Sequence, residues 1–380
     1  MMDAIATPRA KAQALAAVFA QSAAEHDRTA QFPFANFDQL SDAGLLALTA
    51  PRAYGGTGVG IRESAAVVQA IARGEPATAL VLAMQYIQLA AIGRQARWPA
   101  HLATRIVEEA ATSVSLINAL RVEPDLGSPS RGGLPATTAR RDGDGWVLSG
   151  RKIYSTGAPI LRWYVVWART DEPEPRIGVF LVSADAPGIE IVETWNHTGL
   201  RASGSHDVVF DDVAIPFDHA IDLRRPAEWA TPDAHFTPQG LYISAIYQGV
   251  AEAARDWIVS FLHDRTPSSL GAPLATLPRV QEIVGDIDVR LRVNARLIST
   301  TADDFDAGAS VSANEVAAVK LTVTNNAVAI VESALSLSGN HGLSRNNPLE
   351  RHYRDVLCGR VHTPQDDSIR LAYGRAAFNL

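Results

Sequence analysis

The spacing of apolar residues changes twice along this chain of 380 residues, and this change most constrains its fold. Up to about residue 111, apolar residues recur every three or four positions, as in amphipathic helices. From residue 113 to about 216 the period is two, in short runs rich in Val, Ile, Phe and Trp, which indicates β-strands. Helical spacing then returns after a proline-marked linker and continues to the end. This order of segments predicts an α+β fold with three parts.

The spacing also predicts individual elements and domains. We expect helices at residues 12–24, 37–48, 63–73 and 79–92, and longer ones at 240–263, 277–307, 313–337 and 366–378. Asn36 and Thr78 occupy N-cap positions ahead of two of them. Strands are expected at 137–141, 145–149, 163–170, 178–183, 189–194 and 207–215, forming a compact antiparallel β domain. The domains are then an N-terminal helical domain (1–112), a central β domain (113–225) and a C-terminal domain of four-helix type (226–380).

Composition and charge exclude several classes of protein. The chain has 34 basic and 41 acidic residues, a net charge of −7, which disfavours a nucleic-acid partner. A single cysteine, Cys358, excludes an intrachain disulfide, and ten histidines without clustered carboxylates suggest no metal site. Residues 1–24 read as an amphipathic helix and not as a signal peptide. No apolar stretch approaches about 20 residues, so we expect a cytoplasmic protein without a membrane partner.

Most common catalytic motifs are missing from the sequence. It has no GxSxG, no HExxH and no P-loop. Gly56-x-Gly58-x-Gly60 has part of the spacing of a dinucleotide fingerprint, but no strand precedes it. We interpret these glycines as a surface turn.

Six segments, taken in order, carry a resemblance to a known family. They are Pro51-Arg-Ala-Tyr-Gly-Gly-Thr-Gly58, Glu123-Pro-Asp-Leu-Gly-Ser128, Gly150-Arg-Lys-Ile-Tyr-Ser-Thr-Gly157, the run from Gly199 to Pro216, Asp264-Arg265 followed by Gln281, and Ser338-Gly-Asn-His-Gly342 followed by Pro348 to Asp355. Together they resemble the acyl-CoA dehydrogenase superfamily over nearly the whole chain. The resemblance implies a flavin, FAD or FMN, between the β domain and the C-terminal helices. It also implies a homotetramer in which a neighbouring subunit helps to hold the cofactor.

The resemblance assigns flavin contacts residue by residue. Glu123, Gly127 and Ser128 would contact the isoalloxazine edge and the diphosphate side through backbone groups and a hydroxyl. Tyr154, Ser155 and Thr156 would lie along the flavin face, with the Thr156 hydroxyl near N5. Arg265 would reach the diphosphate of a flavin in the partner subunit, and Gly339 and Gly342 would let the backbone approach the distal end of the cofactor. The protein's task would be to position and tune a cofactor that carries the chemistry.

Both positions of the family's catalytic base lack a carboxylate here. A dehydrogenase needs a base to remove the substrate's α-proton while hydride leaves for flavin N5. Counting on from Arg354-Asp355, the position of the usual glutamate is Thr363, and the second known position falls at or near Gln239. Asp366 and Asp367 are displaced by about a helical turn and are typical of residues that cap the last helix.

The missing base points to the monooxygenase branch, which is similar to dibenzothiophene monooxygenase. Those enzymes receive reduced flavin from a separate reductase and use a flavin C4a-hydroperoxide to oxygenate a small apolar or aromatic substrate. Thr156 would supply a hydroxyl near N5, and His362, within His362-Thr-Pro364, an imidazole near the peroxide. A further histidine that this branch uses in the N-terminal domain has no counterpart, and Gln85 or Tyr86 takes its place in a substrate pocket with Gln239 and Thr363. His206 is more simply interpreted as anchoring the strand that it opens.

Two alternatives to a monooxygenase remain open. One is an acyl-CoA dehydrogenase that desaturates an acyl thioester with a displaced base. The other is a flavin-binding protein without catalysis.

Overall fold

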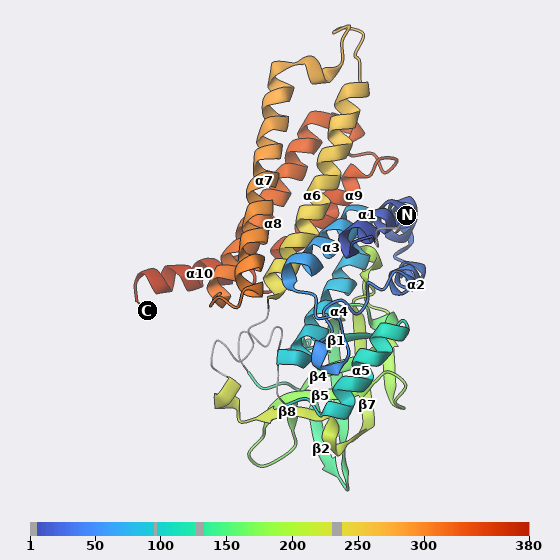
Figure 1. The fold of residues 1–380 in the computed structure, drawn as a ribbon, viewed down its shortest axis with the longest axis vertical. Helices are drawn as coiled ribbons and strands as arrows, with labels where there is room; N and C mark the ends of the chain where they lie inside the picture. Colours follow the sequence, from blue (N-terminus) through green and yellow to red (C-terminus); the bar gives the residue numbers. More distant parts are fainter. Residues whose placement is uncertain (1–5, 95–96, 127–132, 230–237, 380) are drawn as a thin grey trace, which may run out of the picture.

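The computed structural model describes residues 6–94, 97–126, 133–229 and 238–379. Figure 1 shows a bundle of long helices at one end of the molecule, a β-sheet at the other and shorter N-terminal helices beside their junction. The fold of N-terminal helices, central sheet and C-terminal helices is the one that the periodicity predicts.

The N-terminal part consists of five helices. They are α1 (Pro8–Thr29), α2 (Phe34–Asp42), α3 (Ile61–Gly74), α4 (Pro76–Arg94) and α5 (Ala100–Thr112). α1 begins at a cap, because the Thr7 hydroxyl accepts a hydrogen bond from the backbone N–H of Ala10. It buries a stripe of residues at helical spacing against α3: Ala12, Ala16, Phe19 and Ala23.

Two predicted N-caps are wrong. Asn36 lies inside α2 and Thr78 inside α4, and both side chains are buried. Their polar groups satisfy each other instead, since Asn36 Nδ2 donates to Thr78 Oγ1 at 2.9 Å. The helix expected to reach Leu48 ends at Asp42, and turns follow it.

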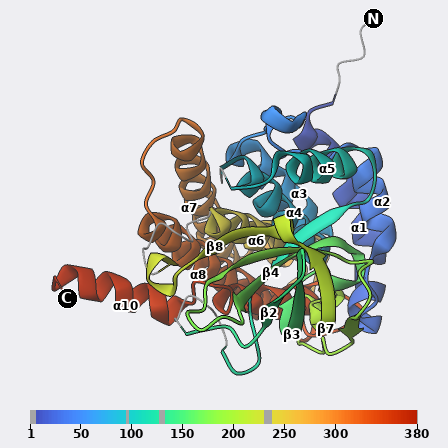
Figure 2. The same ribbon diagram turned by 90° about the horizontal axis from the view of Figure 1, so that it is seen from below.

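The central part is one sheet of eight strands among the described residues. They are β1 (Leu116–Leu120), β2 (Thr138–Asp142), β3 (Gly145–Ser155), β4 (Leu161–Thr170), β5 (Ile177–Ser183), β6 (Ile189–Val192), β7 (His206–Pro216) and β8 (Ala220–Arg224). The strand order is β6-β7-β3-β2-β4-β5-β8, and β1 pairs with β4. Most pairs are antiparallel, as predicted, but β1 and β2 each lie parallel to β4. Figure 2 shows the sheet from below.

The C-terminal part is built on three long helices, α6 (Gln239–Asp264), α7 (Pro278–Asp306) and α8 (Ala313–Ser338). The short helix α9 (Leu349–Leu357) packs on α6 and α8. The last helix, α10 (Asp366–Ala377), projects from the body of the molecule (Figure 1). Its exposed apolar side chains include Leu371 and Tyr373.

A carboxylate from the helical bundle caps the N-terminal domain. Asp306, at the end of α7, accepts hydrogen bonds from the backbone N–H groups of Ile61 and Arg62 at 2.7 and 2.8 Å. A Cβ at Gly60 would lie 2.5 Å from the Asp306 carboxylate, so the glycine permits this approach. The helix N-terminus after the glycine-rich turn therefore already has an internal anion.

One described helix, α4, is long and apolar enough to cross a membrane by length and composition alone. This is a correction, because the sequence analysis expects no apolar stretch of that length. However, 78% of the relevant window is buried inside the protein, as in a core helix.

Candidate functional site

The end of β3 carries three neighbouring side chains with different exposure. Tyr154 has a left-handed backbone (φ 56°) and an exposed ring. Ser155 is buried, and its hydroxyl has no hydrogen-bond partner among the described residues. Thr156 is half-buried, and its hydroxyl lies 3.0 Å from that of Ser205. This segment therefore offers an aromatic ring and two hydroxyls at the rim of the sheet.

The turn after β3 is held against two other elements. Asn118, on β1, donates from Nδ2 to the Thr156 carbonyl at 3.0 Å. Gly157 has φ 78°, and a Cβ there would lie 2.9 Å from a methyl group of Val81 on α4. The Thr156 backbone is thus fixed between the sheet and the N-terminal helices.

An aromatic group beside Tyr154 is not anticipated by the sequence analysis. The rings of Trp195 and His197 stack with their centroids 3.7 Å apart, and the Tyr154 ring meets both edge-on. The sequence does place two aromatic side chains in the loop between two predicted strands, which could have indicated this group. His206 opens β7, and its Nδ1 accepts a hydrogen bond from the Trp195 backbone N–H, so its anchoring role is confirmed.

The Glu123 carboxylate lies inside the β domain. It is 2.6 Å from Nζ of the fully buried Lys152 and accepts further bonds from Ala136 and Thr137. Burial alone would raise the pKa of Glu123, but the bonds from Lys152 and Thr137 lower it overall. Burial lowers the pKa of Lys152 to about 8. The carboxylate is already satisfied, so only the Glu123 backbone is left for a cofactor contact. Gly127 and Ser128 lie outside the described residues.

The loop before α10 places His362 against the helical bundle. The His362 ring lies 5.8 Å from the ring of Tyr247, on α6. Burial, and then the positive charge of Lys320, lowers the pKa of His362 to about 4. The imidazole is therefore neutral at physiological pH and can take part in hydrogen bonds through both ring nitrogens, one as donor and one as acceptor. Its neighbour Thr363 is exposed.

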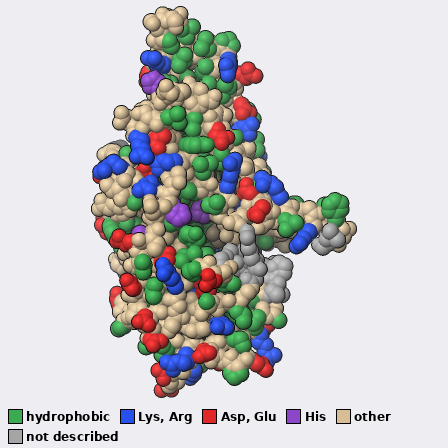
Figure 3. Space-filling model, turned by 180° about the vertical axis from the view of Figure 1, so that it is seen from behind, with side chains coloured by type: hydrophobic (Ala, Val, Ile, Leu, Met, Phe, Trp, Pro, Cys, Tyr) green, Lys and Arg blue, Asp and Glu red, His purple; other side chains and the backbone are tan. Residues whose placement is uncertain are grey.

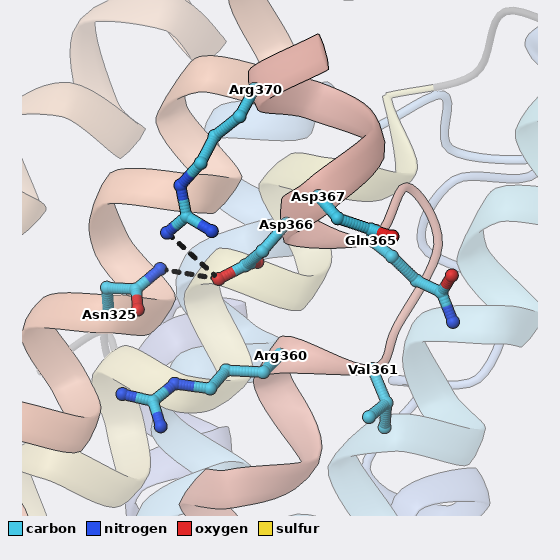
Figure 4. Close-up of a pocket in the computed structure, with 7 residues that line it drawn as sticks. All are labelled: Asn325, Arg360, Val361, Gln365, Asp366, Asp367 and Arg370. Atoms are coloured by element: carbon cyan, nitrogen blue, oxygen red, sulfur yellow. Dashed lines mark hydrogen bonds and ion pairs between the residues drawn. The ribbon is translucent and has the colours of Figure 1, made fainter.

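A cavity of about 570 Å³ opens beside this loop, between α8 and the start of α10 (Figure 4). It is lined by Asn325, Arg360, Val361, Gln365, Asp366, Asp367 and Arg370. Asp366 accepts hydrogen bonds from the buried Lys320 at 3.1 Å and from Asn325 at 2.7 Å. Asp367 is exposed, and its carboxylate accepts from the Ser368 N–H at 2.8 Å. Asp366 is thus committed to an internal ion pair, whereas Asp367 is not.

Two of the expected pocket residues are structural. The Gln85 amide donates to the Ser115 carbonyl and accepts from the Ile117 N–H, so it fastens the start of β1 to α4. The Tyr86 hydroxyl donates to the Leu45 carbonyl at 2.6 Å. Both side chains have no exposed surface, and their assignment to a substrate pocket stays a prediction.

The remaining expected residues lie at the two ends of the helical bundle. Gln239 is the half-buried first residue of α6, and Arg265 follows its last residue. A helix of this length spans about 39 Å, so the two positions are far apart within one chain.

Arg265 does lie near the predicted glycine loop. It lines a second cavity of about 320 Å³ with Phe261, and the Phe261 ring lies 5.2 Å from that of His341. Gly339 has φ 56°, and a Cβ at Gly342 would lie 2.1 Å from the Ser338 hydroxyl. Residues that the resemblance assigns to a partner's cofactor are therefore gathered at one end of the bundle.

No group of three metal-binding side chains occurs among the residues that the structure describes. Figure 3 shows histidine side chains near the middle of the opposite face, between the helical and β parts of the molecule.

Comparison with protein families gives matches in all three parts of the chain. Residues 7–96 match the N-terminal domain of acyl-CoA dehydrogenases, residues 121–213 the middle domain and residues 241–366 the C-terminal domain.

The most informative relatives differ in their activities. A putative acyl-CoA dehydrogenase of Bacillus subtilis, YdbM, is 34% identical over 95% of this chain and 93% of its own. The L-evernosamine nitrososynthase of a Micromonospora species is 31% identical over 93% of this chain and 86% of its own. A solved structure of KijD3 with FMN and a dTDP-linked amino-keto sugar has a TM-score of 0.84 at 30% identity, covering 96% of this chain and 91% of that one.

A more distant solved structure shows the fold alone. TdsC from a Paenibacillus strain, solved with FMN and indole, has a TM-score of 0.86 at 20% identity, covering 97% of this chain and 96% of that chain. The homologues as a group are flavin-dependent oxidoreductases. With a relative above 30% identity along nearly its whole length and three family domains in order, the chain belongs to the acyl-CoA dehydrogenase family.

Proposed function

We propose that this protein is a flavin-dependent monooxygenase that acts on a small apolar or aromatic compound. The observation that carries the proposal is the absence of a carboxylate at both base positions, which are Thr363 and Gln239. The nearby Asp366 does not replace it, because its carboxylate pairs with Lys320. A dehydrogenase without a base has no agent for removing the α-proton.

The residues at the end of β3 fit a flavin. A planar cofactor with polar edges needs an apolar or aromatic surface and fixed donors, which Tyr154 and Thr156 provide. The unpartnered buried hydroxyl of Ser155 supports the same assignment, since a buried polar group without a partner is costly unless a ligand satisfies it. FMN is favoured by the KijD3 relative, and FAD remains the alternative.

A bound reduced flavin would supply the activation of O2, and the chain's residues would control protons around it. The Thr156 hydroxyl would donate a hydrogen bond at N5. Neutral His362 would hold a hydrogen bond at the oxygen that is transferred. The half-buried His362 ring is positioned beside the ring of Tyr247.

The proposed function also implies two kinds of partner, neighbouring subunits and a flavin reductase. We propose a homotetramer in which Arg265 and the Gly339–Gly342 loop serve the flavin of a neighbouring subunit, because one chain places them at the far end of α6. Reduced flavin would come from a separate reductase, and the protein would work in the cytoplasm. Sedimentation analysis would contradict the assembly if a monomer retained flavin tightly.

A dehydrogenase is the second candidate, and two observations favour it. The first is the identity with the Bacillus relative. The second is Asp367, an exposed carboxylate that lines the cavity and pairs with no cation among the described residues. Its side chain could serve as a displaced base. A flavin-binding protein without catalysis is the third candidate.

The test supplies reduced flavin through a reductase under isotopically labelled O2. The substrate panel contains small aromatic heterocycles, apolar sulfur compounds and nucleotide-linked amino sugars, the last because of the nitrososynthase relatives. Incorporation of labelled oxygen into one class supports the proposal and identifies the substrate class. Flavin reoxidation that yields only hydrogen peroxide with every compound counts against a monooxygenase of these classes.

A further inference from the structure

Three hydroxyl groups form a chain that runs from the protein interior to the end of β3. Ser203 Oγ lies 2.8 Å from Ser205 Oγ, and Ser205 Oγ lies 3.0 Å from Thr156 Oγ1. Ser203 has no exposed surface, Ser205 is 3% exposed and Thr156 is half-buried. We call these residues the hydroxyl chain.

The backbone around the hydroxyl chain is fixed by hydrogen bonds between the two segments that carry it. The N–H of Gly157 donates to the Ser203 carbonyl at 3.0 Å, and the N–H of Ala158 donates to the Gly204 carbonyl at 3.1 Å. Gly204 has φ 54°, and a Cβ there would lie 2.8 Å from the ring of Pro159, in the segment that follows Thr156. The close approach of the two segments therefore requires glycine, and the spacing of the hydroxyls is set by the fold.

Counting hydroxyl hydrogens gives the hydrogen bonds of the hydroxyl chain a direction. Three hydroxyls carry three hydrogens, and their two contacts use two of them. If the bonds pointed inward, the third hydrogen would remain on Ser203, which has no other side-chain partner among the described residues. A buried donor without a partner costs about 1–3 kcal/mol. If the bonds point outward, the third hydrogen lies on Thr156, the exposed end.

We infer that Ser203 and Ser205 are positioning residues that turn the Thr156 hydroxyl hydrogen outward as a donor. Ser203 donates to Ser205, Ser205 donates to Thr156, and Thr156 donates to a ligand acceptor. The ligand atom, flavin N5, rests on the proposed function. The direction of the chain rests only on the burial and distances of its three hydroxyls.

Neutron diffraction from deuterated, flavin-free crystals tests the direction itself. The expected result is a deuterium of Ser203 between the two serine oxygens and a deuterium of Ser205 pointing at Thr156. The reverse arrangement overturns the inference, whether or not the protein uses a flavin.

Flavin binding tests what the direction does. Ser205→Ala removes the bond that Thr156 accepts and should weaken flavin affinity about 3- to 10-fold, which corresponds to one hydrogen bond. Isotopic labelling at N5 should show a change in the N5 chemical shift in Ser205→Ala and a smaller one in Ser203→Ala. The matched control is Ser244→Ala, which removes a fully buried hydroxyl that donates to the Gly240 carbonyl.

The outcomes separate this inference from the proposed function. An N5 resonance in folded Ser205→Ala and Ser203→Ala identical to that of the wild type overturns the role of the chain. A wild-type protein that binds neither FMN nor FAD overturns the proposed function, while the neutron result still decides the direction. If Ser205→Ala does not fold, Ser203→Ala gives the same comparison, because it removes only the buried end.

Discussion

Lys320 Nζ lies 3.1 Å from Oδ1 of Asp366, although the Lys320 side chain has no exposed surface. Asp366 also accepts a bond from Asn325, and Arg370 lies 3.8 Å from the same carboxylate, where α10 leaves the bundle (Figure 4). Burial lowers the pKa of Lys320, and its bond to Asp366 opposes that shift. Because the Asp366 carboxylate is paired with Lys320, it is not a free base.

Breaking this ion pair should destabilise the protein strongly. Lys320→Met leaves the partly buried Asp366 carboxylate with only the more distant Arg370, at 3.8 Å, so the loss should approach but not exceed the about 3–5 kcal/mol that breaking a buried pair costs. The double variant Lys320→Met/Asp366→Asn should recover part of that loss, because no uncompensated charge remains. Denaturant unfolding measures both. A single variant as stable as the wild type would show that the pair does not form.

His362 should make the stability of the protein depend on pH in mild acid. The pKa of His362 is about 4 in the folded protein and 6.5 as its ordinary value, so the unfolded chain binds the proton first. The contribution of neutral His362 to the free energy of unfolding is therefore complete above about pH 6.5 and is lost as the pH falls towards 4. Between pH 6.5 and 4, the free energy of unfolding of the wild type should fall relative to that of His362→Asn. The titration of all other groups is common to both proteins and cancels in this difference. A difference independent of pH would contradict the burial of this imidazole.

Thr156→Val should damage flavin chemistry more than folding. The change is nearly isosteric and removes one side-chain hydrogen bond to Ser205, which contributes about 1 kcal/mol to stability. The control is Thr49→Val, which removes a hydroxyl that donates to the Tyr86 carbonyl in the N-terminal domain. Both variants should unfold at similar denaturant concentrations, and only Thr156→Val should slow flavin reactivity. Unchanged reactivity in Thr156→Val would remove this residue from the site.

His362→Ala should reduce turnover about 10²–10³-fold, the usual cost of removing one preorganised hydrogen-bond donor at a reacting oxygen. Asp367→Asn, which changes the exposed carboxylate of the same cavity, should retain most of the rate. Both are measured in one assay with flavin occupancy determined for each. Inactivity of Asp367→Asn combined with a normal rate in His362→Ala would favour a dehydrogenase with a displaced base.

Periodicity predicts the order of the parts because buried helix faces and strands impose different repeats on the sequence. It does not predict β1 or β8, which are five residues each and lie next to helical or turn segments. The N-cap prediction fails at Asn36 because a polar residue ahead of an apolar run can equally pair with a side chain from another helix, here Thr78. Local patterns do not contain such tertiary partners.

The candidate site is predictable from sequence only where a motif fixes the local backbone. The segment from Tyr154 to Thr156 is identified by resemblance, and the structure adds Trp195, which approaches Tyr154 from a separate loop. Gln85 shows the opposite case, because the resemblance assigns it to a substrate pocket, whereas its amide pairs with the backbone of β1. The depressed pKa of His362 likewise depends on burial and on Lys320, which is 42 residues away in sequence.

The central claim is that the site lacks the base of a dehydrogenase, and an anaerobic titration tests it most directly. Flavin-loaded protein is mixed without oxygen with acyl-CoA thioesters bearing short, long, branched and aromatic acyl groups, and the visible absorption of the flavin is recorded. Dithionite, added last, confirms that the flavin can be reduced. If the site has no base, no thioester should bleach the visible absorption of the flavin. Bleaching by an acyl-CoA, abolished in Asp367→Asn, would contradict it and identify an acyl-CoA dehydrogenase with a displaced base.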